Sequence, residues 1–355
     1  MTFGPRHYVP ALKLKTGEKD ALAILSSATK QSITPILQVV ERIGTKPIDK
    51  HIETAFKKIQ PAVAGLPRFF IDPVEIAPAG AVAAKAVFNG CRSLGVPFTP
   101  VVGLSRPPDL TNAAMQAVGR SGLAVRLTRA DFEGGTLASS FTAYLATHSI
   151  SAAATDLIVD LGPVEDMIAD GIATLAESFI ASVPHLARWK TLTLLGSAFP
   201  KSMRHVDRDS HGYVDRAEWV AWRDHFRKAG PSLSRPPTFG DWGIQHPAGV
   251  ETFDPVKMQA SAAIRYATDS KWLLIKGRGT RKMSPAKQMP GLAAQLATGQ
   301  LRKAFAGAHH CAACALIVAA ANGAPKLGSL TKWRQIGTAH HITTTVEAIQ
   351  NLHAP

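Results

Sequence analysis

The sequence predicts an α/β fold, a (β/α)₈ TIM-like barrel with a C-terminal hairpin and helical extension. Short apolar runs alternate with amphipathic stretches about eight times before residue 245, and such alternation implies parallel strands joined by helical crossovers. Apolar residues make up 46% of the 355 residues, which is enough for a large core. No Gly-x-Gly-x-x-Gly follows any of the runs, so the barrel is favoured over its rival, a doubly wound open sheet.

The apolar runs give the expected strands and the amphipathic stretches give the expected helices. The eighth strand is left open between "PTFGDWG" at 237–243 and one arm of a later hairpin. The other seven strands are expected at 7–14, 33–41, 68–73, 98–104, 123–129, 155–162 and 190–197, and the helices at 17–28, 49–63, 79–95, 108–122, 138–149, 164–183 and 216–229.

The rhythm changes beyond residue 260. The stretch 262–279 reads as two strands joined at "TDSK", which is typical of a hairpin. Helical patterns follow, and the last segment ends in a helix. We therefore expect a barrel over 1–260 and a C-terminal part over 261–355 that packs on the barrel and, if the hairpin supplies the eighth strand, completes it.

The charge balance favours anionic partners. The chain has 40 Lys and Arg against 26 Asp and Glu, a net charge of +14 that is spread out without a polybasic tail. A general basic field attracts phosphate-bearing molecules, nucleic acid foremost. Nucleic acid is the expected partner, and a protein partner is the alternative.

Cysteine usage and hydropathy bear on location. Three cysteines cannot make a disulfide framework and suit a reducing cytoplasm. The first 15 residues contain no apolar stretch suited to a signal peptide. The longest apolar run, near 311–321, is shorter than the ~20 residues that a membrane span needs. We expect a cytoplasmic protein without a membrane partner.

Charged residues gather where the expected strands end, and in a barrel the ligand site lies at the carboxyl ends of the strands. Alternation places Asp72 on the same strand face as Arg68, and Asp160 on the same face as Asp156. The set at the strand ends is Lys13, Lys15, Glu41, Asp72, Arg126, Asp160 and Asp241.

This set supports two hypotheses. In the first, carboxylates are catalytic and Asp72 and Asp160 hold Mg²⁺ or Mn²⁺ for phosphodiester hydrolysis, while basic residues bind the phosphate. The catalytic candidates are Asp72, Asp160, Asp241 and Glu41, and the strand-end phosphate ligands are Lys13, Lys15 and Arg126. In the second, the charges meet solvent or pair as salt bridges, and the protein is a non-catalytic sensor or adaptor that binds nucleic acid or a protein.

Asp241 lies between two glycines in "FGDWG". We expect it at the barrel mouth beside Lys13, because the first and eighth strands are neighbours in a closed barrel. A carboxylate next to Phe239 and Trp242 is partly desolvated and needs a partner to stay ionised. The alternative is that Asp241 only caps a turn with its backbone.

The stretch 207–218 has the residue spacing of a calcium-binding loop, except that His211 occupies position five, where an oxygen ligand is usual. A true loop has a helix on each side, and the incoming side contains Pro200. We therefore expect a polar loop followed by a helix start, and no calcium.

The stretch "AHHCAAC" brings Cys311 and Cys314 near a histidine. A closed zinc site needs four ligands, and no second pair stands at a convincing spacing, so we expect a buried helix and no zinc. His340 and His341 are adjacent, and adjacent helical residues face different directions, so at most one would join a given site.

Five segments occur in an order that resembles the phage beta-protein family. They are "YVPALKLKTGEKDAL", "ITPILQVVE", "RAEWVAW", "PTFGDWGIQHP" and "SLTKWRQIGTAHHIT". The resemblance covers nearly the whole chain, and only the "DRDSHGY" insert departs from it. It implies a setting of phage–host conflict or antiviral defence, with no reaction attached. Asp241, Trp333, Arg334, His340 and His341 match positions typical of the family, and we add Arg334, His340 and His341 to the candidate nucleic-acid-binding residues.

Overall fold

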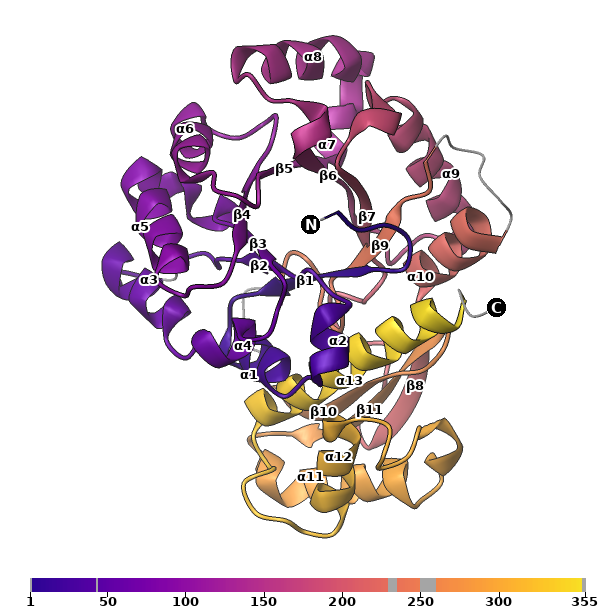
Figure 1. The fold of residues 1–355 in the computed structure, drawn as a ribbon. Helices are drawn as coiled ribbons and strands as arrows, with labels where there is room; N and C mark the ends of the chain where they lie inside the picture. The colour runs from indigo at the N-terminus through magenta and orange to yellow at the C-terminus, as the bar shows by residue number, and fades with distance from the viewer. Residues whose placement is uncertain (1, 43, 229–234, 250–259, 353–355) are drawn as a thin grey trace.

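The computed structural model describes residues 2–42, 44–228, 235–249 and 260–352 and contains a closed barrel of eight parallel strands (Figure 1). The predicted fold class is confirmed. The eighth strand is β9, in the "PTFGDWG" stretch, and it pairs with β1 on one side and β7 on the other. The barrel strands are β1 (Tyr8–Lys13), β2 (Ile36–Gln38), β3 (Phe69–Asp72), β4 (Phe98–Val102), β5 (Leu123–Thr128), β6 (Thr155–Pro163), β7 (Thr191–Ser197) and β9 (Thr238–Asp241).

Helices connect successive barrel strands and form the outer ring (Figure 1). They are α1 (Thr16–Ala23), α2 (Ser27–Gln31), α3 (Ile48–Phe56), α4 (Gln60–Val63), α5 (Gly80–Arg92), α6 (Pro108–Ala117), α7 (Arg129–Phe132), α8 (Leu137–Thr147), α9 (Ala169–Ala181) and α10 (Ala217–Ala221), which continues as a π-helical segment over Trp222–Lys228. Single 3₁₀ turns lie at Val74–Ala79, Glu133–Gly135, Ala152–Ala154 and Leu186–Arg188.

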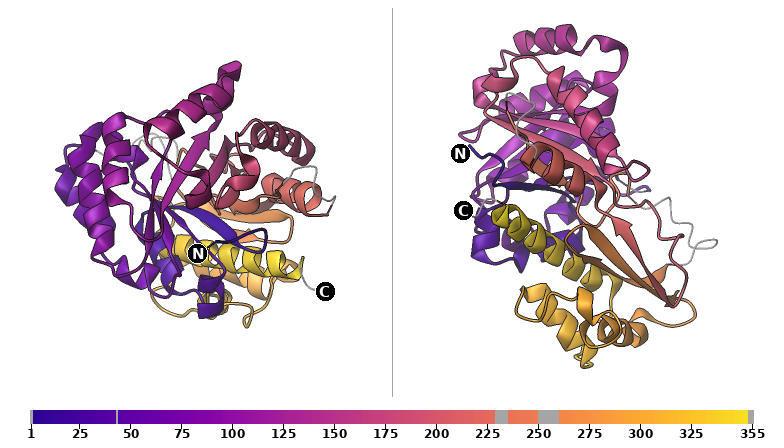
Figure 2. Two further views of the ribbon diagram at one scale, coloured as in Figure 1. Left: turned by 45° about the horizontal axis from the view of Figure 1, so that its top comes forward. Right: turned by 90° about the vertical axis from the view of Figure 1, so that its right-hand side faces the viewer.

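The C-terminal part builds a second layer beside the barrel (Figure 2). The predicted hairpin is confirmed as β10 (Ser261–Ala267) and β11 (Lys271–Gly279), and neither arm enters the barrel. A third strand, β8 (Ser210–Asp215), pairs antiparallel with β11. The loop after β7 thus contributes a strand to the sheet of the C-terminal part. The remaining helices are α11 (Pro285–Ala297), α12 (Ala312–Ala321) and α13 (Leu330–Asn351), with a 3₁₀ turn at Arg302–Ala304.

Strand β8 corrects the expectation of a polar loop at the calcium-like motif. Within the motif, residues Ser210–Asp215 form an extended strand and alternate between half-buried and exposed. This segment is a strand because it pairs with the free edge of β11. The acidic side chains pair with the hairpin instead of converging: Asp209 with Arg278 at 2.8 Å and Asp215 with Lys271 at 3.3 Å. The helix start after the motif is confirmed at Ala217.

Alternation along the strands divides the core into two clusters. Side chains on the inner face fill the barrel, and the other faces pack against the helices. On β9, Phe239 points outward onto Trp219 and Trp222, with ring centroids 5.1 and 5.4 Å away. The inner cluster consists of Val9, Ala11, Ile36, Phe70, Val101, Ala124, Ile158, Leu195 and Trp242.

A buried ion pair closes the end of the barrel from which the strands start. Arg68 donates to both carboxylate oxygens of Asp156, at 2.6 and 2.7 Å, and both side chains are at most 2% exposed. Thr191 donates to the same carboxylate at 2.6 Å. Phe3 and Phe70 lie against the guanidinium, with ring centroids about 5 Å from it. The shared strand face predicted for Arg68 and Asp72 therefore points into the barrel.

Helix α13 joins the two layers. It packs against α1 of the barrel on one side and against β10 and α12 on the other (Figures 1 and 2). Ser329 caps it by accepting from the backbone N–H of Lys332. Because it is enclosed, most of its side chains are buried all round. Within the described ranges, none of the helices combines the length and apolar character that a bilayer span requires.

The Arg68–Asp156 pair makes a direct prediction about stability. Replacing Asp156→Ala leaves Arg68 charged and unpaired inside the barrel, which costs ~3–5 kcal/mol of unfolding free energy. Urea unfolding measures this loss. Glu53→Ala is the control, because it removes an exposed ion pair with Lys50 and should leave the urea midpoint unchanged. Equal midpoints for the two variants would contradict the assignment.

Candidate functional site

The carboxyl ends of the strands converge on Arg126 of β5. Its Nη1 donates to Asp72 at 2.8 Å, and its Nε and Nη2 donate to Asp160 at 2.9 and 2.5 Å. All three side chains are at most 7% exposed. Asp72 ends β3 and Asp160 lies in β6, so one guanidinium links three strands across the barrel mouth.

A second set of contacts extends this network to the other side of the mouth. Arg106, in the loop after β4, holds both oxygens of Asp72 at 2.7 and 2.9 Å. Arg126 also donates to Gln38 at 3.0 Å. Gln38 and Lys13 each donate to one oxygen of Glu75, at 2.7 and 2.6 Å. We call these residues the mouth network: Lys13, Gln38, Asp72, Glu75, Arg106, Arg126 and Asp160.

Each carboxylate of the mouth network forms an ion pair with a Lys or Arg side chain. Burial disfavours the charged form of Asp72, but Arg106 and Arg126 outweigh it and hold the pKa of this carboxyl below its usual range. Burial disfavours the charge on Arg126, but Asp160 and Asp72 outweigh it and raise the pKa of Arg126. Asp72 thus stays ionised, and the Arg126 guanidinium lies between it and Asp160. A divalent ion bound by both would have to displace Arg126, so this geometry does not fit the Mg²⁺ or Mn²⁺ site expected there.

The mouth keeps a surplus of hydrogen-bond donors. A guanidinium carries five N–H groups and an ammonium carries three. Arg126 makes four contacts, to Asp160 twice, Asp72 and Gln38, and Lys13 makes one, to Glu75. Trp242 lies 5.3 Å below the Arg126 guanidinium, is 3% exposed, and its indole N–H has no partner among the described residues. This chemistry suits a ligand rich in acceptors.

Asp241 lies outside this network, which corrects the expected Asp241–Lys13 pair. Asp241 follows Phe239 by two positions on β9, so the two side chains share the outward face of the strand. It is fully buried beneath the C-terminal layer, where it accepts from the Tyr8 hydroxyl at 2.5 Å and from His341 at 2.8 Å. The partner of Lys13 is Glu75.

The contacts of His341 define its tautomer. Its Nδ1 accepts from the indole N–H of Trp272 at 3.4 Å, so its Nε2 carries the proton donated to Asp241. Burial lowers the pKa of His341 despite Asp241, which keeps the ring neutral. Burial opposes the charge on Asp241, but His341, Arg216 and the Tyr8 hydroxyl outweigh it and lower its pKa. The cluster is a closed structural network without an opening for a ligand.

Glu218 of α10 lies beside this cluster, where the charge of Arg216 only partly offsets the effect of burial. It is 4% exposed, and neither carboxyl oxygen has a hydrogen-bond partner among the described residues. Burial, followed by the charge of Asp241, raises the pKa of Glu218 to about 8. The carboxyl is therefore mostly protonated at neutral pH.

The remaining candidates are dispersed. Glu41 and Lys15 are exposed near the mouth, and the backbone N–H of Glu41 donates to Glu75 at 3.0 Å. Arg334 packs on the first turn of α1, where burial lowers its pKa against the pull of Glu18. His340 faces the opposite side of α13 from His341 and is 1% exposed. The structure thus brings together Lys13, Asp72, Arg126 and Asp160 and separates them from the other six: Lys15, Glu41, Asp241, Arg334, His340 and His341.

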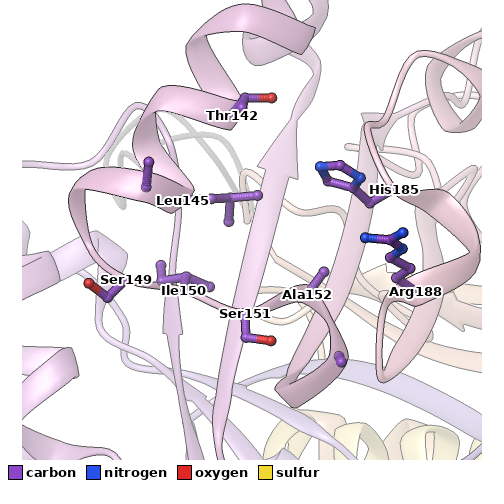
Figure 3. Close-up of a pocket in the computed structure, with 10 residues that line it drawn as sticks. Thr142, Leu145, Ser149, Ile150, Ser151, Ala152, His185 and Arg188 are labelled. Carbon is purple, nitrogen blue, oxygen red and sulfur yellow. The ribbon is translucent and has the colours of Figure 1, made fainter.

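Two of the larger cavities lined by the described residues lie away from the mouth network. One of about 670 Å³ sits beside the N-terminal ends of β6 and β7, where His185 and Arg188 lie across from Leu145 and Ile150 (Figure 3). It is at the end of the barrel opposite to the strand termini that carry ligand sites. Another of about 720 Å³ lies between the β6–α9 loop and β8. Neither brings a converging set of paired charges comparable to the mouth network.

Three members of the mouth network were missed at the sequence level. Gln38 ends β2, which is shorter than the strand predicted over 33–41, so the predicted bounds hid its place at the strand end. Glu75 and Arg106 lie in loops after β3 and β4, where spacing does not specify direction.

Comparison with known families supports the resemblance noted above. The family model described as Beta protein matches residues 8–347, nearly the whole chain. No curated protein and no solved structure matches the chain.

Glu218 predicts a pH dependence of stability. Its folded pKa of about 8 lies above the ordinary 4.5, so its contribution is complete below pH ~4.5 and is lost as the pH rises through about 8. Between pH 5 and 8 the unfolding free energy should fall by up to ~1.4 kcal/mol per pH unit from this group. Glu218→Gln should flatten that part of the profile in urea unfolding. Exposed Glu133→Gln is the control, and a Glu218→Gln profile parallel to wild type would contradict the burial argument.

Proposed function

The chain belongs to the Beta protein family, and from that premise and the geometry of its barrel mouth we propose that it binds a phosphate-bearing ligand, nucleic acid foremost. The binding site is the mouth network with Trp242. In this proposal the protein is a non-catalytic sensor or adaptor. A role in phage–host conflict is part of the proposal and rests on the family resemblance alone.

The donor surplus at the mouth is the observation that carries the proposal. One N–H of Arg126, two of Lys13 and the indole N–H of Trp242 have no acceptor among the described residues. A buried donor without a partner costs roughly 1–3 kcal/mol, so an acceptor that reaches it gains that amount back. Phosphate oxygens are such acceptors.

The carboxylates have a positioning role in this proposal. Asp72 and Asp160 hold three of the donor atoms of Arg126, so the guanidinium is fixed before a ligand arrives. Pre-ordered groups lose little side-chain entropy on binding. The net charge of +14 adds a long-range attraction for a polyanion.

The competing function is metal-dependent phosphodiester hydrolysis at the same mouth. It requires Asp72 and Asp160 to exchange Arg126 for Mg²⁺ or Mn²⁺. Incubation of a labelled oligonucleotide with the protein and either ion measures this directly. Cleavage that disappears in Asp160→Asn would replace the binding proposal with a catalytic one.

The binding test uses two matched substitutions. Fluorescence anisotropy with labelled single-stranded DNA and RNA of mixed sequence measures affinity over a salt series. Trp242→Phe keeps an aromatic side chain but removes the unpartnered indole N–H, so affinity should fall by roughly tenfold. Affinity should also fall steeply as salt is added, since phosphate contacts release counterions.

Trp219→Phe is the control for that substitution. The Trp219 indole N–H is also buried without a partner among the described residues, but it lies outside the barrel, against Phe239. Its replacement should leave affinity unchanged. The proposal fails if neither oligonucleotide binds at low salt, or if the two variants bind alike. A weak dependence on salt would count against nucleic acid as the ligand.

A further inference from the structure

The N-terminus of helix α12 meets α13 and β10 at a cluster of thiols and imidazoles. Cys311 is the N-cap of α12, and its Sγ accepts from the backbone N–H of Cys314 at 3.4 Å. His340 comes from the middle of α13, and its Nδ1 lies 3.3 Å from Sγ of Cys314 and 3.9 Å from Sγ of Cys311. His310, Cys311 and His340 each offer a ligand atom within 4.8 Å of the others.

These separations resemble those of a tetrahedral metal site. With Zn–S of about 2.3 Å and Zn–N of about 2.0–2.1 Å, a sulfur and a nitrogen ligand lie roughly 3.5 Å apart. The two distances from His340 to the thiols bracket this value. One ion could therefore reach His340 Nδ1 and both sulfurs with only small side-chain adjustments.

Each histidine of the cluster also has a partner for its other nitrogen. His340 donates from Nε2 to the backbone carbonyl of Ala267 at 2.8 Å, which leaves Nδ1 unprotonated toward the thiols. The Tyr266 ring stacks on the imidazole at 3.8 Å between centroids and fixes its plane. His310 has Nδ1 3.2 Å from the Glu347 carboxylate. Metal-binding histidines commonly have such a carbonyl or carboxylate behind them, which sets tautomer and orientation.

We propose that Cys311, Cys314, His310 and His340 form a tetrahedral Zn²⁺ site that ties α12 to α13 and β10. The Cys-x-x-Cys spacing supplies two thiolates from one helix turn, and His310 and His340 supply the nitrogens. Sequence spacing alone did not predict zinc, because only one histidine adjoins the cysteines and His340 reaches them through the fold. The proposal is independent of ligand binding at the barrel mouth.

The ligand types select the metal. Two thiolates and two imidazoles suit Zn²⁺, whereas Mg²⁺, Ca²⁺ and Mn²⁺ prefer oxygen ligands. An iron–sulfur cluster uses four cysteines in its common forms. A cavity of about 350 Å³, lined in part by His310, Cys311 and Glu347, gives an entry path. Zinc binding requires the His310 Nε2 to leave its contact with Thr344, now 3.1 Å long.

The test measures zinc stoichiometry on the full chain. Protein reduced and stripped with a chelator is titrated with Zn²⁺ in competition with a chromogenic chelator. One ion per chain should bind. Co²⁺ in its place should give a thiolate-to-cobalt charge-transfer band and the intense visible absorption of tetrahedral cobalt. Zinc should also raise the melting temperature, because a ligand that binds only the folded state stabilises it.

Two substitutions make the test specific. Cys311→Ser removes one ligand but keeps an efficient N-cap for α12, so it should fold and lose at least tenfold in zinc affinity. His309→Ala changes an exposed neighbour of His310 and should bind like wild type. The charge-transfer band should weaken in Cys311→Ser and persist in His309→Ala.

Three results would overturn the proposal. The first is reduced protein that binds no zinc. The second is stoichiometric zinc that binds equally well in Cys311→Ser. The third is cobalt absorption without a thiolate charge-transfer band. If the reduced protein binds no zinc and Cys311 and Cys314 oxidise to a disulfide, the pair has a redox role instead of a metal-binding role.

Discussion

The guanidinium of Arg126 is the interaction on which the barrel mouth depends. It is the cation shared by Asp72 and Asp160, two carboxylates that are almost wholly buried. Removing ions from water is expensive unless partners compensate, so without Arg126 the buried carboxylate of Asp160 would lose its cation and the like charges at the ends of β3 and β6 would repel each other. Arg126 also donates to Gln38, and Gln38 donates to Glu75. Lys13 donates to the same carboxylate, so Arg126 is connected to Lys13 through two side chains.

Charged pairs occupy both ends of the barrel interior, and an apolar layer separates them. Arg68 and Asp156 form one pair, and Arg126 with its two aspartates forms the other. Between them lie side chains such as Phe70 and Ile158. The first pair lies at the end of the barrel where the strands start, against Phe3 and Phe70. The second is at the carboxyl ends of the strands, where barrels bind ligands, and its donors are only partly used.

The sequence predicted those features that depend on periodicity. Alternation along β3 and β6 correctly placed Arg68 with Asp72 and Asp156 with Asp160, because a strand period of two is fixed by backbone geometry. The same rule puts Asp241 on one face of β9 with Phe239, and that face is outward; the neighbouring positions of the first and eighth strands predict that their ends meet but not which face carries Asp241. The motif at 207–218 became β8 because a distant hairpin offered an edge. Arg106, Glu75 and the approach of His340 to Cys311 depend on loop direction and helix docking, which local pattern does not contain.

Binding of Mn²⁺, followed by its electron paramagnetic resonance signal, tests most directly whether the mouth is organised by arginine or by metal. Mn²⁺ prefers oxygen ligands, so the thiol cluster of α12 does not interfere. Wild-type protein should bind no Mn²⁺ tightly, since Arg126 occupies the space between Asp72 and Asp160. Arg126→Met frees Asp160, leaves Asp72 paired with Arg106 alone, and should increase Mn²⁺ affinity. One tightly bound Mn²⁺ in wild type, lost in Asp72→Asn, would contradict the arginine-centred mouth.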